Sequence, residues 1–339
     1  MSKRVAFLTA SLASRMILPH FLHNWGTNMR RLSAAIAGSL VLSLPVVAFA
    51  QAYLGDPNSL SSSFEYTYAP SGQIIATTGD DGDAFDNAVP GVPEQVHIFN
   101  IGLQYMTPVE GLAAEVSIPL VGLKLGDTHF IHYPQVGEYD DGDMHFTFTD
   151  LRGGLRYQVK AIEEYIGLSF LVAGSVPVTD YPVNGFLFPD HHLKTLYLGG
   201  SVARTLDPAI PDAFFSIDYT FALRERVDET ENTERFNRNY TDAGVLLGYF
   251  LPAGFNIAAG ANMRRSHGGV TLGDLIVQPM DVQVHHDRLL DEDFVHVGGN
   301  LGYSVSDAFD VGAAVRFFVW GENTRNQNLF GLYANYTIF

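Results

Sequence analysis

The chain of 339 residues contains no cysteine. It therefore has no disulfide framework, no Cys-based metal site and no thiolate nucleophile. A chain without thiols also suits an oxidising compartment such as the periplasm, where free thiols are a hazard. After residue 50 no run of eighteen apolar residues remains, which excludes a helical membrane span in that part of the sequence.

The chain also has few positively charged residues. Lysine and arginine number 20 against 37 aspartates and glutamates, for a net charge of −17. Five of the positive residues and no acid lie in the first fifty positions, so the charge of residues 51–339 is −22. Phosphate binding needs a basic face, and this balance excludes nucleic acid as a partner.

The first fifty residues have the parts of a secretory signal peptide. A basic pair follows Met29 and precedes the apolar run Leu32–Phe49, which ends in the small-x-small pattern Ala48-Phe49-Ala50. We predict that translation starts at Met29 and that cleavage follows Ala50, with Ala52 as the second choice. Residues 1–50 are then an N-terminal extension plus signal peptide. A membrane anchor is the alternative, although polar residues and a proline interrupt the run.

Long stretches of the mature chain have an apolar residue at every second position. One such set is Phe215, Ile217, Tyr219, Phe221 and Leu223. Successive side chains of a strand point to opposite faces, so each stretch has one apolar face and one polar or small face. The stretches run about ten to twelve residues, which is enough to cross a bilayer at a tilt, whereas strands of soluble sheets average five or six. They predict strands at 62–69, 94–106, 111–124, 145–159, 164–177, 193–204, 212–224, 239–250, 254–266, 293–305, 309–320 and 328–339.

The connections between the predicted strands alternate in length. Those after the even-numbered strands are short and those after the odd-numbered strands are mostly long. Short periplasmic turns that alternate with longer outer loops are typical of outer-membrane barrels. An edge exposed to lipid would leave backbone groups unpaired, which forces closure. The sequence thus predicts an all-β fold, a single transmembrane antiparallel up-and-down β-barrel of about twelve strands over residues 51–339, preceded by a cleaved signal peptide.

Several long loops are acidic, and we expect them to be flexible: 79–87, 138–143, 225–234 and 287–293. Clustered carboxylates make two of them candidates for weak surface binding of divalent cations, through Asp80, Asp81, Asp83, Asp140, Asp141 and Asp143. Their spacing does not match a twelve-residue EF-hand loop. We therefore predict no resident metal and no cofactor.

The strand ends also fit a membrane barrel. Aromatic belts at both bilayer interfaces are expected, and tyrosines fall near the ends of predicted strands at Tyr66, Tyr68, Tyr105, Tyr157, Tyr249, Tyr303 and Tyr336. The chain ends in an alternating strand with the aromatic Phe339, which resembles the signal read by the bacterial barrel-assembly machinery. Outer-membrane lipid and that machinery are therefore the expected partners, together with a small-molecule solute.

Charged side chains on the polar faces point into the barrel by parity. The candidate lumen residues are Glu115, Asp150, Arg152, Arg156, Asp218, Arg224, Arg264, His296, Asp310 and Arg316, with Glu65 and Asp242 facing the same way. Such charges can line a water-filled pore and set its selectivity. They can equally pair with one another and fill the interior. Twelve strands enclose a lumen that side chains need not fill, because interior width grows with strand number.

A barrel enzyme is a further interpretation. A hydrolase needs a hydroxyl nucleophile beside a histidine base. Ser266-His267 and the pair His296 and Asn300 are the candidates, but the latter two point inward by parity, whereas a phospholipase site should face lipid. The hydrolase pattern G-x-S-x-G is also absent. We predict that the protein is not an enzyme.

Four short motifs can be compared with a known family. They are Ile118-Pro119-Leu120, Asp150-Leu151-Arg152-Gly153-Gly154-Leu155-Arg156-Tyr157, Val176-Pro177 and Leu196-Tyr197-Leu198-Gly199-Gly200. Their arrangement over about residues 95–339 resembles the MetA-type phenol-degradation outer-membrane proteins. Thr149 replaces a glycine of the family pattern, and no glycine follows Thr179. The resemblance implies passage of small hydrophobic or aromatic compounds and transfers no catalytic residue.

The sequence therefore predicts an outer-membrane channel or transporter for passive passage of small molecules, hydrophobic or aromatic ones among them. Two alternatives stay open. A structural or surface-interaction barrel with an occluded lumen is favoured by the capacity for interior ion pairs. A lipid-modifying barrel enzyme would need a lipid-facing Ser–His pair.

Overall fold

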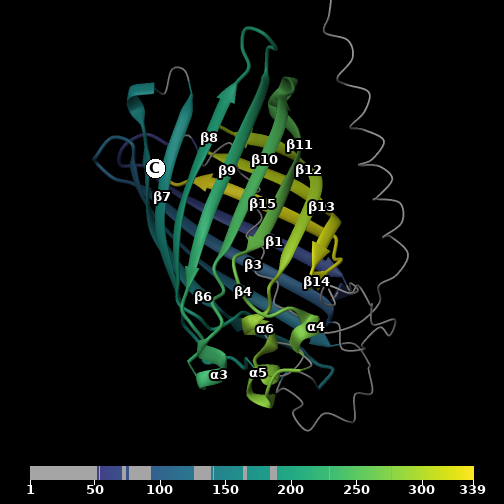
Figure 1. Ribbon diagram of the computed structural model, residues 1–339. Helices are drawn as coiled ribbons and strands as arrows, with labels where there is room; N and C mark the ends of the chain where they lie inside the picture. Colours follow the sequence, from purple (N-terminus) through teal and green to yellow (C-terminus); the bar gives the residue numbers. More distant parts are fainter. Residues whose placement is uncertain are drawn as a thin grey trace, which may run out of the picture.

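The computed structural model is a β-barrel with short helices gathered at one end (Figure 1). It describes residues 52, 54–70, 74–75, 93–125, 139, 141–162, 166–183, 189–228, 230–275 and 277–339. The expected extension and signal peptide lie outside these residues. Within the described ranges, no helix is long and apolar enough to cross a membrane.

The wall is one antiparallel sheet that closes on itself. Its strands are β1 (Leu60–Pro70), β3 (Pro93–Met106), β4 (Leu112–Leu125), β5 (Met144–Phe148), β6 (Asp150–Gln158), β7 (Gly167–Pro177), β8 (Thr195–Thr205), β9 (Ala213–Arg224), β10 (Tyr240–Phe250), β11 (Phe255–Ser266), β12 (Asp293–Ser306), β13 (Phe309–Glu322) and β15 (Leu329–Thr337). Neighbours in the chain pair in order, and β1 closes the barrel by pairing with both β3 and β15. Because β5 and β6 occupy one position beside β4, the predicted twelve-strand barrel is confirmed.

The fourth predicted strand is interrupted in the structure. Leu120 of β4 lies opposite Phe148 of β5, whereas Ser117 lies opposite Arg152 of β6, so the register shifts by one residue at Thr149. One extra residue on one strand of an antiparallel pair is a β-bulge. Pro119 explains its position, because proline has no N–H to donate to the ladder. The Pro119 carbonyl oxygen still accepts the N–H of Thr149, at 3.1 Å.

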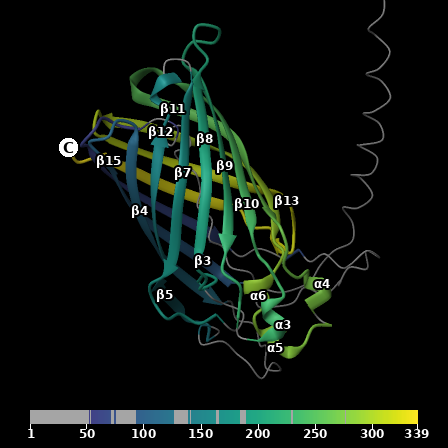
Figure 2. The ribbon, with the colours of Figure 1, turned by 60° about the vertical axis from the view of Figure 1, so that its left-hand side comes forward.

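The barrel has two different ends. At one, the turn end, the connections 107–111, 159–166, 206–212, 251–254 and 307–308 are short, and the C-terminus lies there (Figure 2). Two 3-10 turns, η1 (Lys160–Ile162) and η2 (Pro252–Gly254), belong to these connections. The other, the loop end, carries the long connections. Both termini of the barrel thus reach the end with short turns, as the predicted topology requires.

The outward face of the wall is apolar. Leu155, Val172, Leu247 and Leu332 are each more than half exposed, while their neighbours in the strand turn inward. Exposed tyrosines gather at the turn end, at Tyr105, Tyr157, Tyr249, Tyr303 and Tyr336. An apolar outer band with an aromatic girdle is the surface that a bilayer requires of a barrel.

The long loops contain short strands and helices. A small antiparallel pair joins β2 (Ile74–Ile75) to β14 (Thr324–Arg325). Four short helices follow one another at the loop end: α3 (Glu231–Glu234), α4 (Leu272–Leu275), α5 (Met280–Val284) and α6 (His286–Leu289). The acidic segment 79–87 lies outside the described residues.

Leu247 offers a test of the outward face, since it lies on the outer side of β10, three residues before the strand ends at Phe250, and is 58% exposed. We expect Leu247→Arg to destabilise the folded protein in lipid by about 1–3 kcal/mol, because a charge that faces the hydrocarbon of the bilayer is costly even away from the midplane. Leu247→Phe is the control and should fold like the parent chain. Denaturant titration of folding into vesicles measures both, and equal stability of the two variants would contradict a lipid-facing Leu247.

Candidate functional site in the barrel lumen

Polar residues from different strands face the middle of the lumen, and we call this set the lumen belt: Glu65, Glu115, Arg156, Asp218, Asn262, Asn300 and Arg316. Each lies on the face opposite exposed apolar neighbours. Asp218, for example, alternates with Ile217 and Tyr219, which are both about half exposed on the outside. The belt therefore puts charges and amides in a space surrounded by an apolar wall.

One side of the belt is internally paired. Arg156 donates through Nε to Glu115 Oε2 at 3.1 Å, and its guanidinium is 6% exposed. The pair joins adjacent strands, because Ala113 and Glu115 of β4 lie beside Arg156 and Gly154 of β6. A buried guanidinium needs such a partner, since removing a charge from water is costly without one.

Arg316, in another part of the belt, is bound differently from Arg156. Arg316 Nη1 donates to two backbone carbonyl oxygens, Val315 at 3.0 Å and Gly299 at 3.2 Å. No carboxylate of the described residues lies within ion-pair distance of it, although the charge of Glu65 acts on it from across the sheet. Asp218, Asn262 and Arg316 line a common cavity in the wall of β9–β13, with about 280 Å³ of empty volume that includes open solvent.

Several oxygens of the belt have no hydrogen-bond donor in the described part of the chain. They are Glu65 Oε1, Asp218 Oδ1, Asn262 Oδ1 and Asn300 Oδ1. The Asp218 carboxylate also interacts with the hydroxyls of Ser201 and Ser216, the latter at 3.4 Å from Oδ2. Buried polar atoms are nearly always satisfied in native proteins, so an accumulation of unpaired acceptors at one level of the lumen points to solvent or a ligand.

Towards the loop end a second ionic group ties the wall to the loops. Arg264 of β11 makes a bidentate contact with Asp242 of β10, at 2.8 and 2.9 Å. Glu292 lies 3.7 Å from Arg264 and 3.8 Å from Arg238, and its other oxygen accepts the hydroxyl of Thr324 at 3.0 Å. All of these guanidinium groups and Glu292 are buried. The contacts join three successive loops to the barrel.

Asp190 and His191 lie beneath the same loops and are buried. Burial raises the pKa of the Asp190 carboxyl, and the charge of Arg224 opposes this. Burial, and then the positive charges of Arg224 and Arg238, hold the pKa of His191 well below its usual range, so this imidazole is neutral. Arg288 donates to the His191 carbonyl oxygen at 2.9 Å, which fixes the loop after β7 against α6.

The loops have an apolar core of their own. Its buried members come from three connections and are Leu193, Val227, Val270, Leu275, Val282, Leu289 and Leu290, with Phe236 packed against them. We call the parts of residues 189–194, 225–239 and 267–292 that surround this core the cap. A loop that merely frays in solvent would not bury several aliphatic side chains, so the cap is a folded part of the loop end.

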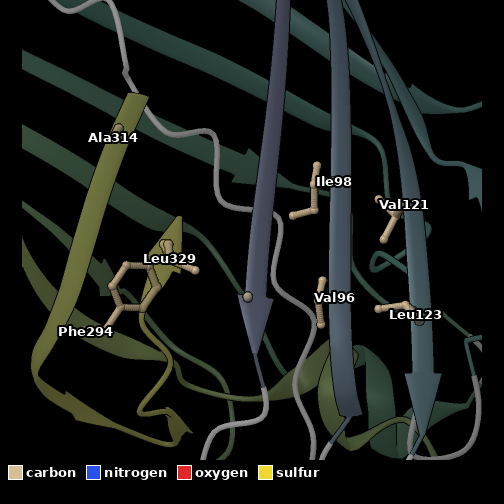
Figure 3. Packing of buried hydrophobic residues seen from close by; sticks show 8 residues of the cluster. Val96, Ile98, Val121, Leu123, Phe294, Ala314 and Leu329 are labelled. Carbon is tan, nitrogen blue, oxygen red and sulfur yellow. The ribbon is translucent and has the colours of Figure 1, made fainter. Parts of the chain in front are cut away.

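The inner wall beside the cap is apolar. We call its buried members the apolar wall: Ala69, Val96, Ile98, Val121, Leu123, Phe294, Ala314 and Leu329. Val96 and Ile98 of β3 project to the same side as Val121 and Leu123 of β4 (Figure 3). The apolar wall adjoins the belt, because Leu329 pairs with Arg316 across β13 and β15. An apolar surface inside the barrel is unexpected where porin lumens are polar.

The segment before β1 narrows the lumen at the turn end. Leu54 is buried against Met106 and Ala113, which are inward-facing residues of β3 and β4. Its N–H donates to Gln158 Oε1 at 2.9 Å. The segment before β1 therefore lies against the inner wall of the lumen.

The remaining candidate lumen residues are spread along the barrel. Arg152 and Arg224 stack on Tyr197 and Tyr240, with 4.3 and 4.6 Å from guanidinium carbon to ring centroid. Asp150 accepts the Tyr181 hydroxyl at 2.9 Å.

Two candidates of the lumen set lie further from the belt. Asp310 is exposed near the turn end. His296 is buried, and its Nε2 is 3.0 Å from the Gln327 carbonyl oxygen.

The structure does not bring the candidate catalytic residues together. Ser266 exchanges hydrogen bonds with the backbone of Glu292, at 2.8 and 3.0 Å, and His267 contacts the hydroxyl of Thr241 at 2.7 Å. Within the described residues, no group of three or more metal-ligating side chains occurs. Asp141 accepts from the Asp143 N–H and contacts His145, while Asp80, Asp81, Asp83 and Asp140 lie outside the described residues.

Sequence reasoning missed the cap and the narrowing by Leu54. The signals were present, since Val270, Leu275, Val282 and Leu289 recur at intervals of five and seven residues in a stretch read as loop. Such a pattern indicates an amphipathic segment. The spacing of these residues shows neither which loops pack against this segment nor that Glu292 lies beside two arginines.

A substitution of Glu292 tests whether buried ion pairs hold the cap on the barrel. We expect Glu292→Gln to destabilise the barrel by about 3 kcal/mol, because one partner of a buried ionic group is removed. Glu225→Gln is the matched control, since Glu225 and Lys194 form an exposed pair at 3.1 Å that should contribute about 1 kcal/mol or less. Urea unfolding in detergent measures both, and equal losses would show that burial does not matter here.

The comparisons with known proteins concern the fold. No protein-family model and no curated protein matches the sequence. The COG4313 outer membrane channel from Pseudomonas putida F1 is similar in structure, with a TM-score of 0.61 and 11% identity over 84% of this chain and 97% of that chain. The NanC porin has a TM-score of 0.45 and 8% identity over 82% of this chain and 98% of that chain. The translocator domain of the autotransporter NalP from Neisseria meningitidis has a TM-score of 0.43 and 9% identity, over 84% and 90%.

The likeness to the Pseudomonas putida structure identifies an architecture and no individual family. The chain has the fold of outer-membrane β-barrels, a closed antiparallel barrel of twelve wall positions. Its apolar outward face provides the contact with membrane lipid. Together the fold and this surface place the protein in the bacterial outer membrane.

Proposed function

We propose that the protein is a narrow outer-membrane channel through which small molecules pass passively, hydrophobic and aromatic ones among them. The observation that supports it best is the lumen belt, where Asp218 and Asn262, each with an unpaired oxygen, line a cavity in the wall of β9–β13. A barrel stabilised only by its interior would pair these groups with one another. The concentration gradient drives the flux, and no catalytic group takes part.

The apolar wall supports the choice of solute. Between the cap and the belt the interior side chains, such as Ile98, Val121 and Phe294, are aliphatic or aromatic and are buried against one another. Pockets for small organic molecules are lined mainly by such groups, with a few polar ones that fix orientation. The resemblance to MetA-type proteins points to the same class of solute, and the similar structure from Pseudomonas putida is that of an outer membrane channel.

The paired arginines and the narrowed ends favour a second candidate. The cap, the Arg156–Glu115 pair and the buried Leu54 together reduce the open lumen. A structural barrel with an occluded lumen would have the same features. The two candidates differ in conductance, because an occluded barrel passes no ions.

Conductance is the direct test, measured on protein purified from outer membranes and added to a planar bilayer. We expect small, stable steps, because the lumen is narrow, and their reduction by aromatic solutes added on one side. Leu54→Ala should raise the step size, because it shortens a side chain at the turn end. Leu247→Ala on the outer face is the control and should leave the steps unchanged.

The contrary result is equally clear. A silent bilayer from protein that still shows heat-modifiable migration on a gel would contradict the channel and support the occluded barrel. Steps that Leu54→Ala leaves unchanged would keep the channel but remove the turn end as its narrow point.

A further inference from the structure

Arg152 of β6 points into the lumen and has no hydrogen-bonded partner in the part of the chain that the structure describes. Its guanidinium forms no ion pair there either, whereas Arg156 and Arg264 of the same inner wall are paired with carboxylates. The side chain is only partly buried, so water in the lumen reaches it. A guanidinium has five N–H donors and no acceptor, and those of Arg152 are therefore left for water or a solute.

The side chain of Arg152 is nevertheless held in position. Its guanidinium carbon lies 4.3 Å from the ring centroid of Tyr197 on β8, so the side chain extends across β7. Stacking uses the face of the guanidinium and leaves free the N–H groups, which lie in its plane. An arginine fixed in this way is preorganised for a planar group that accepts two hydrogen bonds, and a carboxylate is such a group.

The inward residues beside Arg152 are small. In the register of the sheet it lies opposite Ser117 of β4 and Ser175 of β7, and Gly154 is the next inward residue of its own strand. Among the described residues the Ser117 hydroxyl has no hydrogen-bond partner. This hydroxyl can therefore donate to the same solute as the guanidinium.

Asp150 is the nearest acid on the inner face of β6. Its carboxylate accepts the Tyr181 hydroxyl at 2.9 Å and the Ser175 hydroxyl at 3.5 Å, so a donor already faces each of its oxygens. The charge of Arg224 also acts on it. Asp150 thus has other partners and does not occupy the donors of Arg152.

The charges of this part of the barrel leave a positive excess. Those on the inner face of β6–β11 between the belt and the cap, and those buried beneath the cap, are Arg152, Arg224, Arg238, Arg264, Arg288, Asp150, Asp190, Asp242 and Glu292. Five arginines against four acids leave one positive charge. Because the other acids contact or lie near the other arginines, the excess belongs to Arg152.

We infer that Arg152 binds the carboxylate group of a small solute in the lumen, with the Ser117 hydroxyl as a second donor. The inference rests on the proposed channel, because it names the chemical group by which the channel recognises a solute. The chain as a whole is strongly negative, so only a local site would hold an anion here. Chloride has the charge of a carboxylate and lacks its planar shape.

Binding is measured without conductance, by saturation-transfer NMR on the intact protein in detergent. The probes are acetate and acetamide, which are similar in size and shape and differ in charge. We expect acetate to bind about tenfold more tightly than acetamide, because hydrogen bonds between two charged groups are the stronger ones. Chloride should displace acetate only at several times the acetate concentration, since it cannot accept two parallel hydrogen bonds in one plane.

Substitutions locate the site. Arg152→Gln removes the charge and should reduce the affinity for acetate to that for acetamide. Arg226→Gln is the matched control, because Arg226 is exposed two residues beyond the end of β9, and should leave acetate binding unchanged. Arg152→Lys keeps the charge without the planar fork and should weaken acetate binding about threefold. It also serves as the second variant should Arg152→Gln fail to fold.

Conductance gives an independent readout of the same site. In a planar bilayer with a gradient of potassium acetate, Arg152→Gln should shift the reversal potential towards the equilibrium potential of potassium. Arg226→Gln should leave the reversal potential of the parent chain unchanged.

Three results would overturn the inference. Equal affinity of the parent chain for acetate and acetamide would show that the charge of the solute is not recognised. Equal losses in Arg152→Gln and Arg226→Gln would assign acetate binding to the overall charge of the loop end. Displacement of acetate by an equal concentration of chloride would exclude recognition of the carboxylate shape. Conductance without acetate binding would reject this inference and keep the channel, whereas acetate binding without conductance would reject the channel and keep the site.

Discussion

The structure depends on one constraint, which is that no backbone N–H or C=O may remain unpaired in lipid. The wall strands other than the short β5 meet it through a neighbour on each side, and the barrel is complete only because β1, the first strand, also pairs with β15, the last. Closure then separates two environments along each strand, since alternate side chains face lipid or the interior. Pro119, a proline in the interior of β4, is accommodated by a bulge at Thr149 that leaves the wall intact.

Closure has a consequence for the interior. Charges that cannot face lipid gather in a space of limited width, where an isolated charge is costly and pairing is strong. Arg156 and Glu115 follow this rule, as do Arg264, Asp242 and Glu292. The second group reaches beyond the wall to Arg238, so the same electrostatic demand that stabilises the barrel also fastens the cap. Two kinds of interaction therefore hold the loop end in place. They are the buried ion pairs at this end of the barrel wall and the apolar core of the cap itself.

The fold was predictable from the sequence because its signals are local and repeated. Alternation in a stretch such as Phe215–Leu223 defines a strand and its two faces, and the rhythm of short and long connections defines the barrel. The cap was not predictable, because Leu193, Val227 and Leu289 come from three loops and become a core only when closure brings those loops together. The same holds within the lumen. Parity places Arg156 and Arg316 on the inner face, but only the register shows that Glu115 meets the first and that carbonyl oxygens meet the second.

Arg156 is bound to a carboxylate and Arg316 to carbonyl oxygens. This difference says more about function than the number of charges in the lumen does. An unsatisfied buried acceptor costs about 1–3 kcal/mol, so several of them at one level are expensive for a barrel that has only to be stable. The Arg316 guanidinium donates to the carbonyl oxygens of Val315 and Gly299, although it lines the same cavity as Asp218. This arrangement favours the proposed channel over a barrel that serves stability alone.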